Sequence, residues 1–338
     1  MILNQLNKQT NKTEKVMRSL KWNTSVTDLL GIQYPIVQGG LAHLAYADLA
    51  AAVSNAGGLG QVTAMSLDTP EQLVDEIRKT KSLTDKPFGV NFAIGQHGRP
   101  YEHMLEAALK EGIAAVSVTG GNPGPFLDYV KGTQVKKLVL VAARRQAMKA
   151  EQLGADAVMV VGQEGGGHLG RDDIGTSVLI PQVVDSVKIP VIASGGFGDG
   201  RGLMAALALG AEGIEMGTRF IAVKECVHAH ELYKNALVSG TENDTVIIKR
   251  SIGAPARVIA NSWTDKILDI EKENGGYEQL KDYISGKANQ RYIHDGVEGE
   301  GFAWAGQVMG LIHDVPSTAE LFSRIIDQAE AIRSKWAD

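Results

Sequence analysis

The chain has 338 residues, 44% hydrophobic and 22% charged, which is enough for one large globular domain or for a barrel that carries an insertion. A net charge of -5 without clustered basic residues gives no surface for a nucleic-acid backbone or an anionic membrane, and no apolar run is long enough to span a membrane. The single cysteine, Cys226, excludes an internal disulfide and a cysteine-rich metal site and fits a reducing compartment, so we expect a cytoplasmic protein.

The N-terminal segment 1–24 is rich in Asn, Lys and Thr and lacks the apolar core of a secretory signal peptide. We expect a loosely ordered arm with one helical turn near residues 16–20. A mitochondrial presequence is the weaker interpretation, because Glu14 and the scarcity of arginine argue against it.

From residue 35 to residue 220, short apolar or β-branched runs alternate with Ala- and Leu-rich helical segments, as in repeated β–α units around a parallel sheet. The predicted strands are 36–38, 60–63, 88–92, 115–118, 137–142, 157–161, 191–193 and 213–216, and the predicted helices are 47–55, 70–80, 101–110, 123–131, 144–153, 177–186 and 200–209. Eight strands predict an α/β fold of the (β/α)8 TIM-barrel type. An open doubly wound sheet is the alternative, but it would place its phosphate-binding glycines after the first strand.

Beyond the eighth predicted strand the composition becomes more polar, and helices are predicted at 262–273 and 277–285. This change predicts a smaller, mostly helical domain over residues 227–302, placed above the barrel mouth to cover the substrate. The barrel would then comprise 25–226 and 303–338. Apolar positions at helical spacing in 317–336 predict a closing helix that packs back against the barrel.

The last two strands both end in glycine turns, which is the most informative feature of the chain. The seventh strand runs into Ser194, Gly195 and Gly196, and the eighth runs into Gly217 and Thr218. Glycine turns let backbone N–H groups approach an anion closely. Adjacent turns of this kind match the phosphate site after strands seven and eight of a barrel.

The loop after the sixth strand places three glycines, among them Gly166 and Gly167, directly before His168. Such a backbone can lie flat against a planar ligand while the imidazole faces the barrel mouth, where it can exchange a proton near neutral pH. The first strand ends at Gln38, and the third carries Asn91. Their amides can hydrogen-bond the edge of a polar ring. His228 and His230 have a metal-like spacing, but no cysteine or carboxylate cluster completes a site, so we predict no metal.

Together these motifs resemble the 2-nitropropane dioxygenase family of FMN barrels, which includes nitronate monooxygenases, FMN-dependent enoyl-ACP reductases and NADH:quinone reductases. The resemblance runs from residue 31 to the C-terminus and rests on segments 35–40, 55–59, 86–91, 164–168, 194–196, 216–220 and 305–311. It implies that FMN is the cofactor and that His168 is the active-site histidine. It also implies flavin ring or ribityl contacts from Gln38, Gly39, Gly40, Asn91, Gly166 and Gly167, and phosphate contacts from Ser194, Gly195, Gly196, Gly217 and Thr218.

Two positions depart from the family pattern. The sixth loop has a glycine, Gly165, where relatives usually have alanine, and the fifth strand ends in Ala142 and Ala143 where some relatives place a lysine near the flavin. The second departure removes a cation that would tune the redox chemistry.

The resemblance predicts an FMN-dependent nitronate monooxygenase that oxidises alkyl nitronates, of the propionate 3-nitronate type, with O2. The alternative is an NAD(P)H-dependent FMN reductase acting on quinones or on enoyl-ACP, for which Lys249, Arg250 and Arg257 would form either a carrier-docking patch or ordinary solvated surface. A nucleotide dehydrogenase of the inosinate type needs a cysteine that the sixth loop lacks. A non-catalytic flavin- or phosphate-binding module remains the other class, and the sequence leaves open the electron donor and whether the chain forms a homodimer.

Overall fold

The computed structural model describes residues 22–95 and 100–336. The predicted helical turn at 16–20, most of the predicted N-terminal arm and His97 lie outside this part of the chain.

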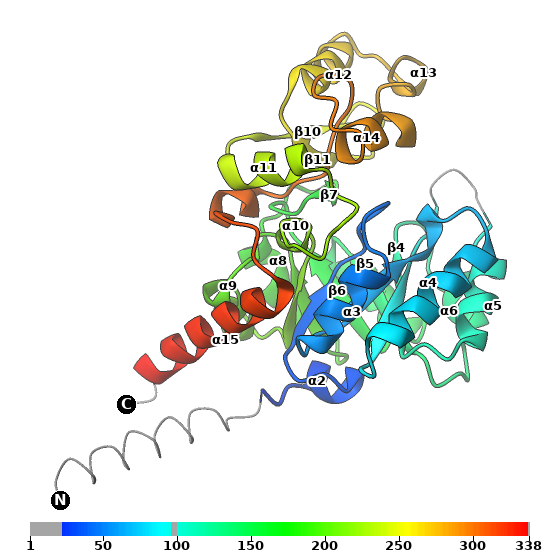
Figure 1. The fold of residues 1–338 in the computed structure, drawn as a ribbon, viewed down its shortest axis with the longest axis vertical. Helices are drawn as coiled ribbons and strands as arrows, with labels where there is room; N and C mark the ends of the chain where they lie inside the picture. Colours follow the sequence, from blue (N-terminus) through cyan, green and yellow to red (C-terminus); the bar gives the residue numbers. More distant parts are fainter. Residues whose placement is uncertain (1–21, 96–99, 337–338) are drawn as a thin grey trace, which may run out of the picture.

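A barrel of parallel strands forms the centre of the molecule (Figure 1). Its eight strands follow the order β1-β9-β8-β6-β5-β4-β3-β2, and a parallel bridge between Val37 and Leu59 joins β1 to β2 and closes the ring. The strands are β1 (Ile36–Gln38), β2 (Gly60–Thr63), β3 (Phe88–Ala93), β4 (Ala115–Thr119), β5 (Lys136–Val141), β6 (Ala157–Val161), β8 (Val191–Ser194) and β9 (Gly213–Met216). The predicted (β/α)8 barrel is confirmed, with every predicted strand found to within one residue at each end.

Helices surround the barrel. They are α2 (Ser25–Leu30), α3 (Ala47–Asn55), α4 (Pro70–Leu83), α5 (Glu102–Lys110), α6 (Gly124–Tyr129), α7 (Arg144–Gln152), α8 (Thr176–Val184), α9 (Gly200–Ala208), α10 (Thr218–Ile221) and α15 (Thr318–Lys335), with a 3-10 turn η1 (Ala64–Ser66). A capping box between Ser317 and Glu320 starts α15, which buries Leu321, Ile325 and other apolar positions against α9 and α3. The closing helix therefore packs back on the barrel as predicted.

The barrel interior changes from apolar to polar along its axis. Val26 and Leu30 of α2 pack with the inward residues Val37, Leu59 and Ile192 at the amino end. Side chains two positions further along a strand point the same way. The next inward residues are accordingly Gln61, Ser194 and, on neighbouring strands in register, Asn91, Ser117 and Glu215, all of them buried. Buried hydrogen-bonding side chains therefore line the interior of the barrel at its carboxyl end, and they are called the polar floor below.

Residues 227–302, here called the cap segment, lie beyond the carboxyl ends of the strands (Figure 1). They form α11 (Glu231–Ser239), β10 (Thr245–Ile248), β11 (Ala256–Ile259), α12 (Ser262–Lys272), α13 (Tyr277–Leu280) and α14 (Gly286–Ile293), after which η2 (Gln307–Leu311) leads to α15. The hairpin of β10 and β11 was not predicted. The predicted helix 277–285 is wrong beyond Leu280, because the Ser285 hydroxyl accepts a hydrogen bond from the Ala288 N–H and starts α14.

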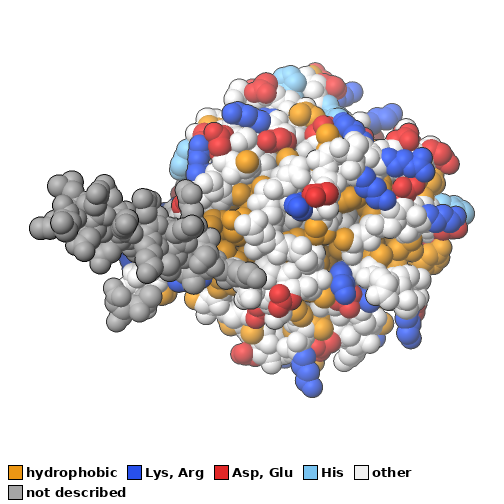
Figure 2. Space-filling view, turned by 60° about the horizontal axis from the view of Figure 1, so that its bottom comes forward, with side chains coloured by type: hydrophobic (Ala, Val, Ile, Leu, Met, Phe, Trp, Pro, Cys, Tyr) orange, Lys and Arg blue, Asp and Glu red, His pale blue; other side chains and the backbone are white. Residues whose placement is uncertain are grey.

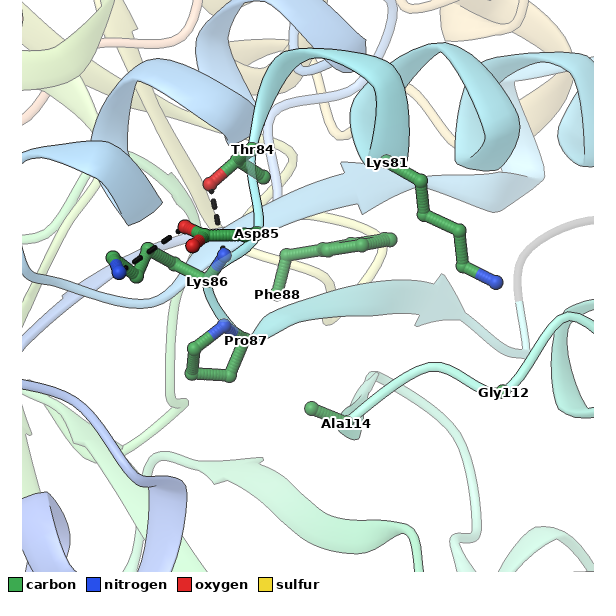
Figure 3. Close-up of a pocket in the computed structure, with 8 residues that line it drawn as sticks. All are labelled: Lys81, Thr84, Asp85, Lys86, Pro87, Phe88, Gly112 and Ala114. Carbon is green, nitrogen blue, oxygen red and sulfur yellow. Dashed lines mark hydrogen bonds and ion pairs between the residues drawn. The ribbon is translucent and has the colours of Figure 1, made fainter.

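The outer surface of the barrel shows no segregation of charge on the face drawn in Figure 2, where acidic and basic side chains alternate among hydrophobic ones. A hollow of about 320 Å³ lies at the amino end of β3 (Figure 3). It is lined by Lys81, Thr84, Asp85, Lys86, Pro87, Phe88, Gly112 and Ala114. It therefore opens at the opposite end of the barrel from the loops that carry the predicted site. Within the described residues, no helix is long and apolar enough to cross a membrane.

Candidate active site

The predicted cofactor residues form an arc along the carboxyl ends of neighbouring strands. Ser194, Gly195 and Gly196 end β8, and Gly217 and Thr218 end the adjacent β9. The next strand in the ring is β1, whose following residue Gly39 donates its N–H to the carbonyl of Met216 at 2.9 Å. The sheet order therefore places the turns after β1, β9 and β8 side by side.

Gly40 and Asn91 are in close contact. A Cβ atom on Gly40 would lie 2.3 Å from Oδ1 of Asn91, so only glycine fits here without displacing the amide. Asn91 is 2% exposed and donates from Nδ2 to the Ser117 hydroxyl at 2.8 Å. The amide is thus held by its neighbour, and the backbone at Gly40 leaves its own face open to a ligand.

Gln38 is oriented differently from what a ring contact requires. Its side chain is fully buried, accepts a hydrogen bond from the N–H of Gln61 at 2.9 Å and donates to the carbonyl of Gly39. In this arrangement Gln38 braces the turn at Gly39, and it would act on a ligand through that turn.

The sixth loop is fixed by Glu164, a residue to which sequence reasoning gave no separate role. Its carboxylate accepts hydrogen bonds from the N–H and the hydroxyl of Thr176 at 2.9 and 2.7 Å. Its carbonyl accepts one from Gln307 at 2.9 Å. A Cβ on Gly166 would meet the Gly306 nitrogen at 2.6 Å, and Gly306 donates to the Thr218 hydroxyl at 3.0 Å. The sixth loop, the β9 turn and the returning chain near residue 306 therefore form one unit.

His168 lies on a strand shared with the cap segment. Gly167 and His168 form β7, which pairs antiparallel with Arg257 and Ala256 of β11. The His168 Nε2 atom lies 2.7 Å from Nζ of Lys249, and its ring centroid lies 5.3 Å from that of Trp304. His168 is exposed, so the histidine sits where the barrel loops and the cap segment meet.

The basic residues proposed for carrier docking are mostly not available at the surface. Lys249 and Arg257 are each 7% exposed. The guanidinium of Arg257 donates hydrogen bonds to the carbonyl of Gln163 and to the hydroxyl of Thr245. Arg250 pairs with Asp173 at 2.9 Å. Both predictions for these residues, a docking patch and ordinary solvated surface, are therefore wrong for Lys249 and Arg257, because these two side chains are buried. Burial lowers the pKa of Lys249 to about 8.

Glu215 places a carboxyl group directly beneath the arc. Its Oε1 atom would lie 2.7 Å from a Cβ on Gly39, and it shares a hydrogen bond with Ser194. Burial raises the pKa of Glu215, and the hydrogen bond from Ser194 opposes this effect without cancelling it. The raised pKa extends toward higher pH the range in which this carboxyl is protonated and can donate a hydrogen bond as well as accept one.

Four other histidines of the described chain, His43, His228, His230 and His294, make structural contacts. His230 caps α11 by accepting the Leu232 N–H at 3.1 Å, and the ring of His228 stacks edge-on against Tyr46. His294 contacts the carbonyl of His43 at 2.9 Å and so ties the first barrel loop to the cap segment. The described residues contain no cluster of three or more His, Cys, Asp or Glu side chains that could hold a metal ion.

The arc offers hydrogen-bond donors to a phosphate group. Gly195 and Gly196 have φ values of +87° and +89°, a backbone conformation that glycine adopts readily. Among the described residues, no hydrogen bond occupies the N–H groups of Gly196 and Gly217. The Thr218 hydroxyl accepts from Gly306 and keeps its own proton to donate. These groups would hold a phosphate, and the polar floor from Asn91 to Glu215 would lie below the rest of the cofactor.

Comparison with known families identifies the chain. The model of the family described as nitronate monooxygenase matches residues 23–100 and 93–328. The chain belongs to the nitronate monooxygenase family. It is therefore an oxidoreductase of a flavin-dependent group.

Known proteins that are similar to the chain carry different names. A probable nitronate monooxygenase of Staphylococcus saprophyticus is 32% identical over 94% of this chain and 100% of its own length. A (3aS,4S,5R,7aS)-5-hydroxy-7a-methyl-1-oxo-octahydro-1H-indene-4-carboxyl-CoA dehydrogenase of Rhodococcus jostii is 34% identical over 92% of this chain and 96% of its own. The structure of FabK from Thermotoga maritima superposes with a TM-score of 0.87 at 37% identity, covering 93% and 98% of the two chains.

Proposed function

We propose that the protein is an FMN-dependent nitronate monooxygenase that oxidises small alkyl nitronates, such as propionate 3-nitronate, with O2. The observation that carries this proposal is the continuous arc of glycine turns from Gly39 through Gly217 to Gly196, with His168 on the adjoining sixth loop. Membership of the nitronate monooxygenase family supports it.

The residues would divide the work between cofactor and substrate. Gly195, Gly196, Gly217 and Thr218 would hold the phosphate, and Gly39, Gly40, Asn91, Gly166 and Gly167 would line the ring and the ribityl chain. When bound, FMN supplies the electron acceptor for oxidation of the substrate. His168 would orient a nitronate by hydrogen bonding or remove the α-proton of a neutral nitroalkane. The cap segment would exclude water from the bound substrate.

Oxygen consumption by the FMN-saturated protein tests the proposal. We expect rapid uptake with propionate 3-nitronate, and none from the same protein without a nitronate. The variant Thr218→Ala is expected to lose bound flavin, because it removes the hydroxyl that Gly306 and the phosphate would share. Thr133→Ala is the matched control, since the Thr133 hydroxyl bonds only the local carbonyl of Val130. Absence of oxygen uptake with every nitronate would overturn the assignment.

The second candidate is an NAD(P)H-dependent reductase acting on quinones or on enoyl thioesters, including enoyl-ACP. The similarities to FabK and to a CoA-thioester dehydrogenase favour it. Anaerobic stopped-flow reduction of the flavin separates the two candidates. Fast bleaching by NADH or NADPH and slow bleaching by nitronates would select the reductase, and the reverse result would select the monooxygenase.

A further inference from the structure

Lys249 is a buried cation in direct contact with the candidate catalytic histidine. It follows β10, is 7% exposed and adopts a φ of +65°, which is uncommon for a residue with a side chain. Its N–H donates to Oε2 of Glu271 at 2.9 Å, and its carbonyl accepts from Ala254 at 3.1 Å. The backbone is therefore held in an unfavourable conformation that directs Nζ to within 2.7 Å of Nε2 of His168.

Among the described residues, the Lys249 ammonium forms no ion pair with a carboxylate. The charge of Glu271 on α12 acts on it electrostatically, but the two oxygens of Glu271 accept the N–H groups of Lys249 and Ser251. Asp173 is paired with Arg250. Within the described residues no carboxylate forms an ion pair with Lys249.

In the described part of the chain, the Lys249 ammonium contacts two rings, the imidazole of His168 and the ring of Trp304, whose centroid lies 5.3 Å from Nζ. A buried ammonium that pairs with no carboxylate is costly, and such a cost is retained where an anionic ligand supplies the missing charge.

We propose that Lys249 is a specificity-determining residue that makes the His168 site select substrates carrying a small planar oxyanion, such as a nitronate or a carboxylate. The proposal rests on the assignment of His168 to the site and deepens the proposed function. An ammonium can only donate, so Nε2 of His168 accepts from Lys249 and the ring proton is placed on Nδ1. The pair then carries one positive charge at the junction of barrel and cap, with Trp304 as an apolar wall that strengthens its attraction for an anion.

Binding of non-reacting probes tests this inference without turnover. Isothermal titration calorimetry with nitrate and with acetate would measure anion affinity of the FMN-containing protein. Acetamide, which has the shape of acetate and carries no charge, serves as the uncharged probe. We expect Lys249→Met to weaken both anions by about 10- to 100-fold and to leave the affinity for acetamide within about twofold.

Two further variants separate charge from packing. Lys249→Arg keeps the cation and is expected to retain anion affinity. Lys266→Met is the matched control, because Lys266 also lies 5.3 Å over a tryptophan ring, that of Trp263, but on the exposed side of α12. It should bind anions like the wild type. In the wild type, anion affinity should fall as the pH rises above about 8, where Lys249 loses its proton, and this fall should be absent from Lys249→Arg.

Each result of these binding measurements either supports or overturns the role proposed for Lys249. Equal loss of anionic and neutral probes in a folded Lys249→Met protein, or unchanged anion affinity, overturns the inference and leaves Lys249 a structural residue. Anion selectivity that follows Lys249 in a protein that oxidises no nitronate upholds the inference while the proposed function fails. Should Lys249→Met not fold, the pH dependence of Lys249→Arg against the wild type decides the matter alone.

Discussion

Replacing Lys249 with methionine is expected to stabilise the protein at neutral pH, although it removes a hydrogen bond. Burial lowers the pKa of Lys249 from 10.5 to about 8. An unfolded chain leaves the lysine pKa at about 10.4. Below pH 8 the folded protein must hold a charge that burial disfavours, whereas the unfolded chain holds it freely. Methionine has a similar length and no charge, so it removes this penalty.

The size and sign of the effect follow from the two pKa values. Their difference corresponds to about 3 kcal/mol of destabilisation at pH 7. Because the folded pKa is the lower one, the unfolded chain binds more protons between pH 8 and 10.5, and wild-type stability recovers as the pH rises through that interval. The penalty falls to about 2 kcal/mol at pH 9. Subtracting about 1 kcal/mol for the lost hydrogen bond to His168 leaves a net gain of about 2 kcal/mol at pH 7 and about 1 kcal/mol at pH 9.

Urea unfolding of the wild type and of Lys249→Met at pH 7 and pH 9 measures the change directly. The control is Lys131→Met, because Lys131 is exposed. Its difference from the wild type should be the same at both pH values. A Lys249→Met protein whose advantage does not shrink between pH 7 and pH 9, or that is less stable than the wild type at pH 7, would refute the reasoning.

Three further predictions concern the arc and its histidine. Gly40→Ala should displace Asn91 and lower flavin content at least about tenfold, measured as the ratio of flavin to protein absorbance, whereas Gly286→Ala, which meets no atom within 4 Å, should not. Glu215→Gln should be more stable than the wild type at pH 7 and lose that advantage toward pH 4. The raised folded pKa makes wild-type stability fall as pH rises through it, and urea unfolding across this range checks the sign. His168→Asn should lower kcat for neutral nitroalkanes by about 10²- to 10⁴-fold and affect preformed nitronates less, with flavin content unchanged.

The sequence alone determined the barrel and which of its loops form the candidate site. Eight β-branched runs between Ala- and Leu-rich helices can be recognised locally, because the periods of strands and helices show in short stretches of consecutive residues. The glycine turns at Gly195 and Gly217 can likewise be recognised from the few residues around them. Parallel strands must bring their carboxyl ends to one edge, so their order in the chain was enough to predict that these turns are neighbours.

The secondary structure of the cap segment was harder to predict from the sequence. Its hairpin of β10 and β11 consists of two four-residue strands, and β11 pairs with β7, which comes from the sixth barrel loop. The β-branched residues of segment 245–248 are typical of a strand, although no strand was predicted there. The pairing of Gly167 with Arg257 spans a sequence separation over which no local pattern carries information.

Only the tertiary structure decided what surrounds His168. In the sequence Lys249 stands beside Arg250 in a polar stretch, where solvated surface is the expected state of a lysine. The fold buries Lys249 against His168 and leaves Arg250 outside, paired with Asp173. Lys249 and His168 are 81 residues apart in the sequence, so their contact depends on how distant elements pack together. That packing places a positive charge at the barrel mouth and lowers the pKa of Lys249, which carries it.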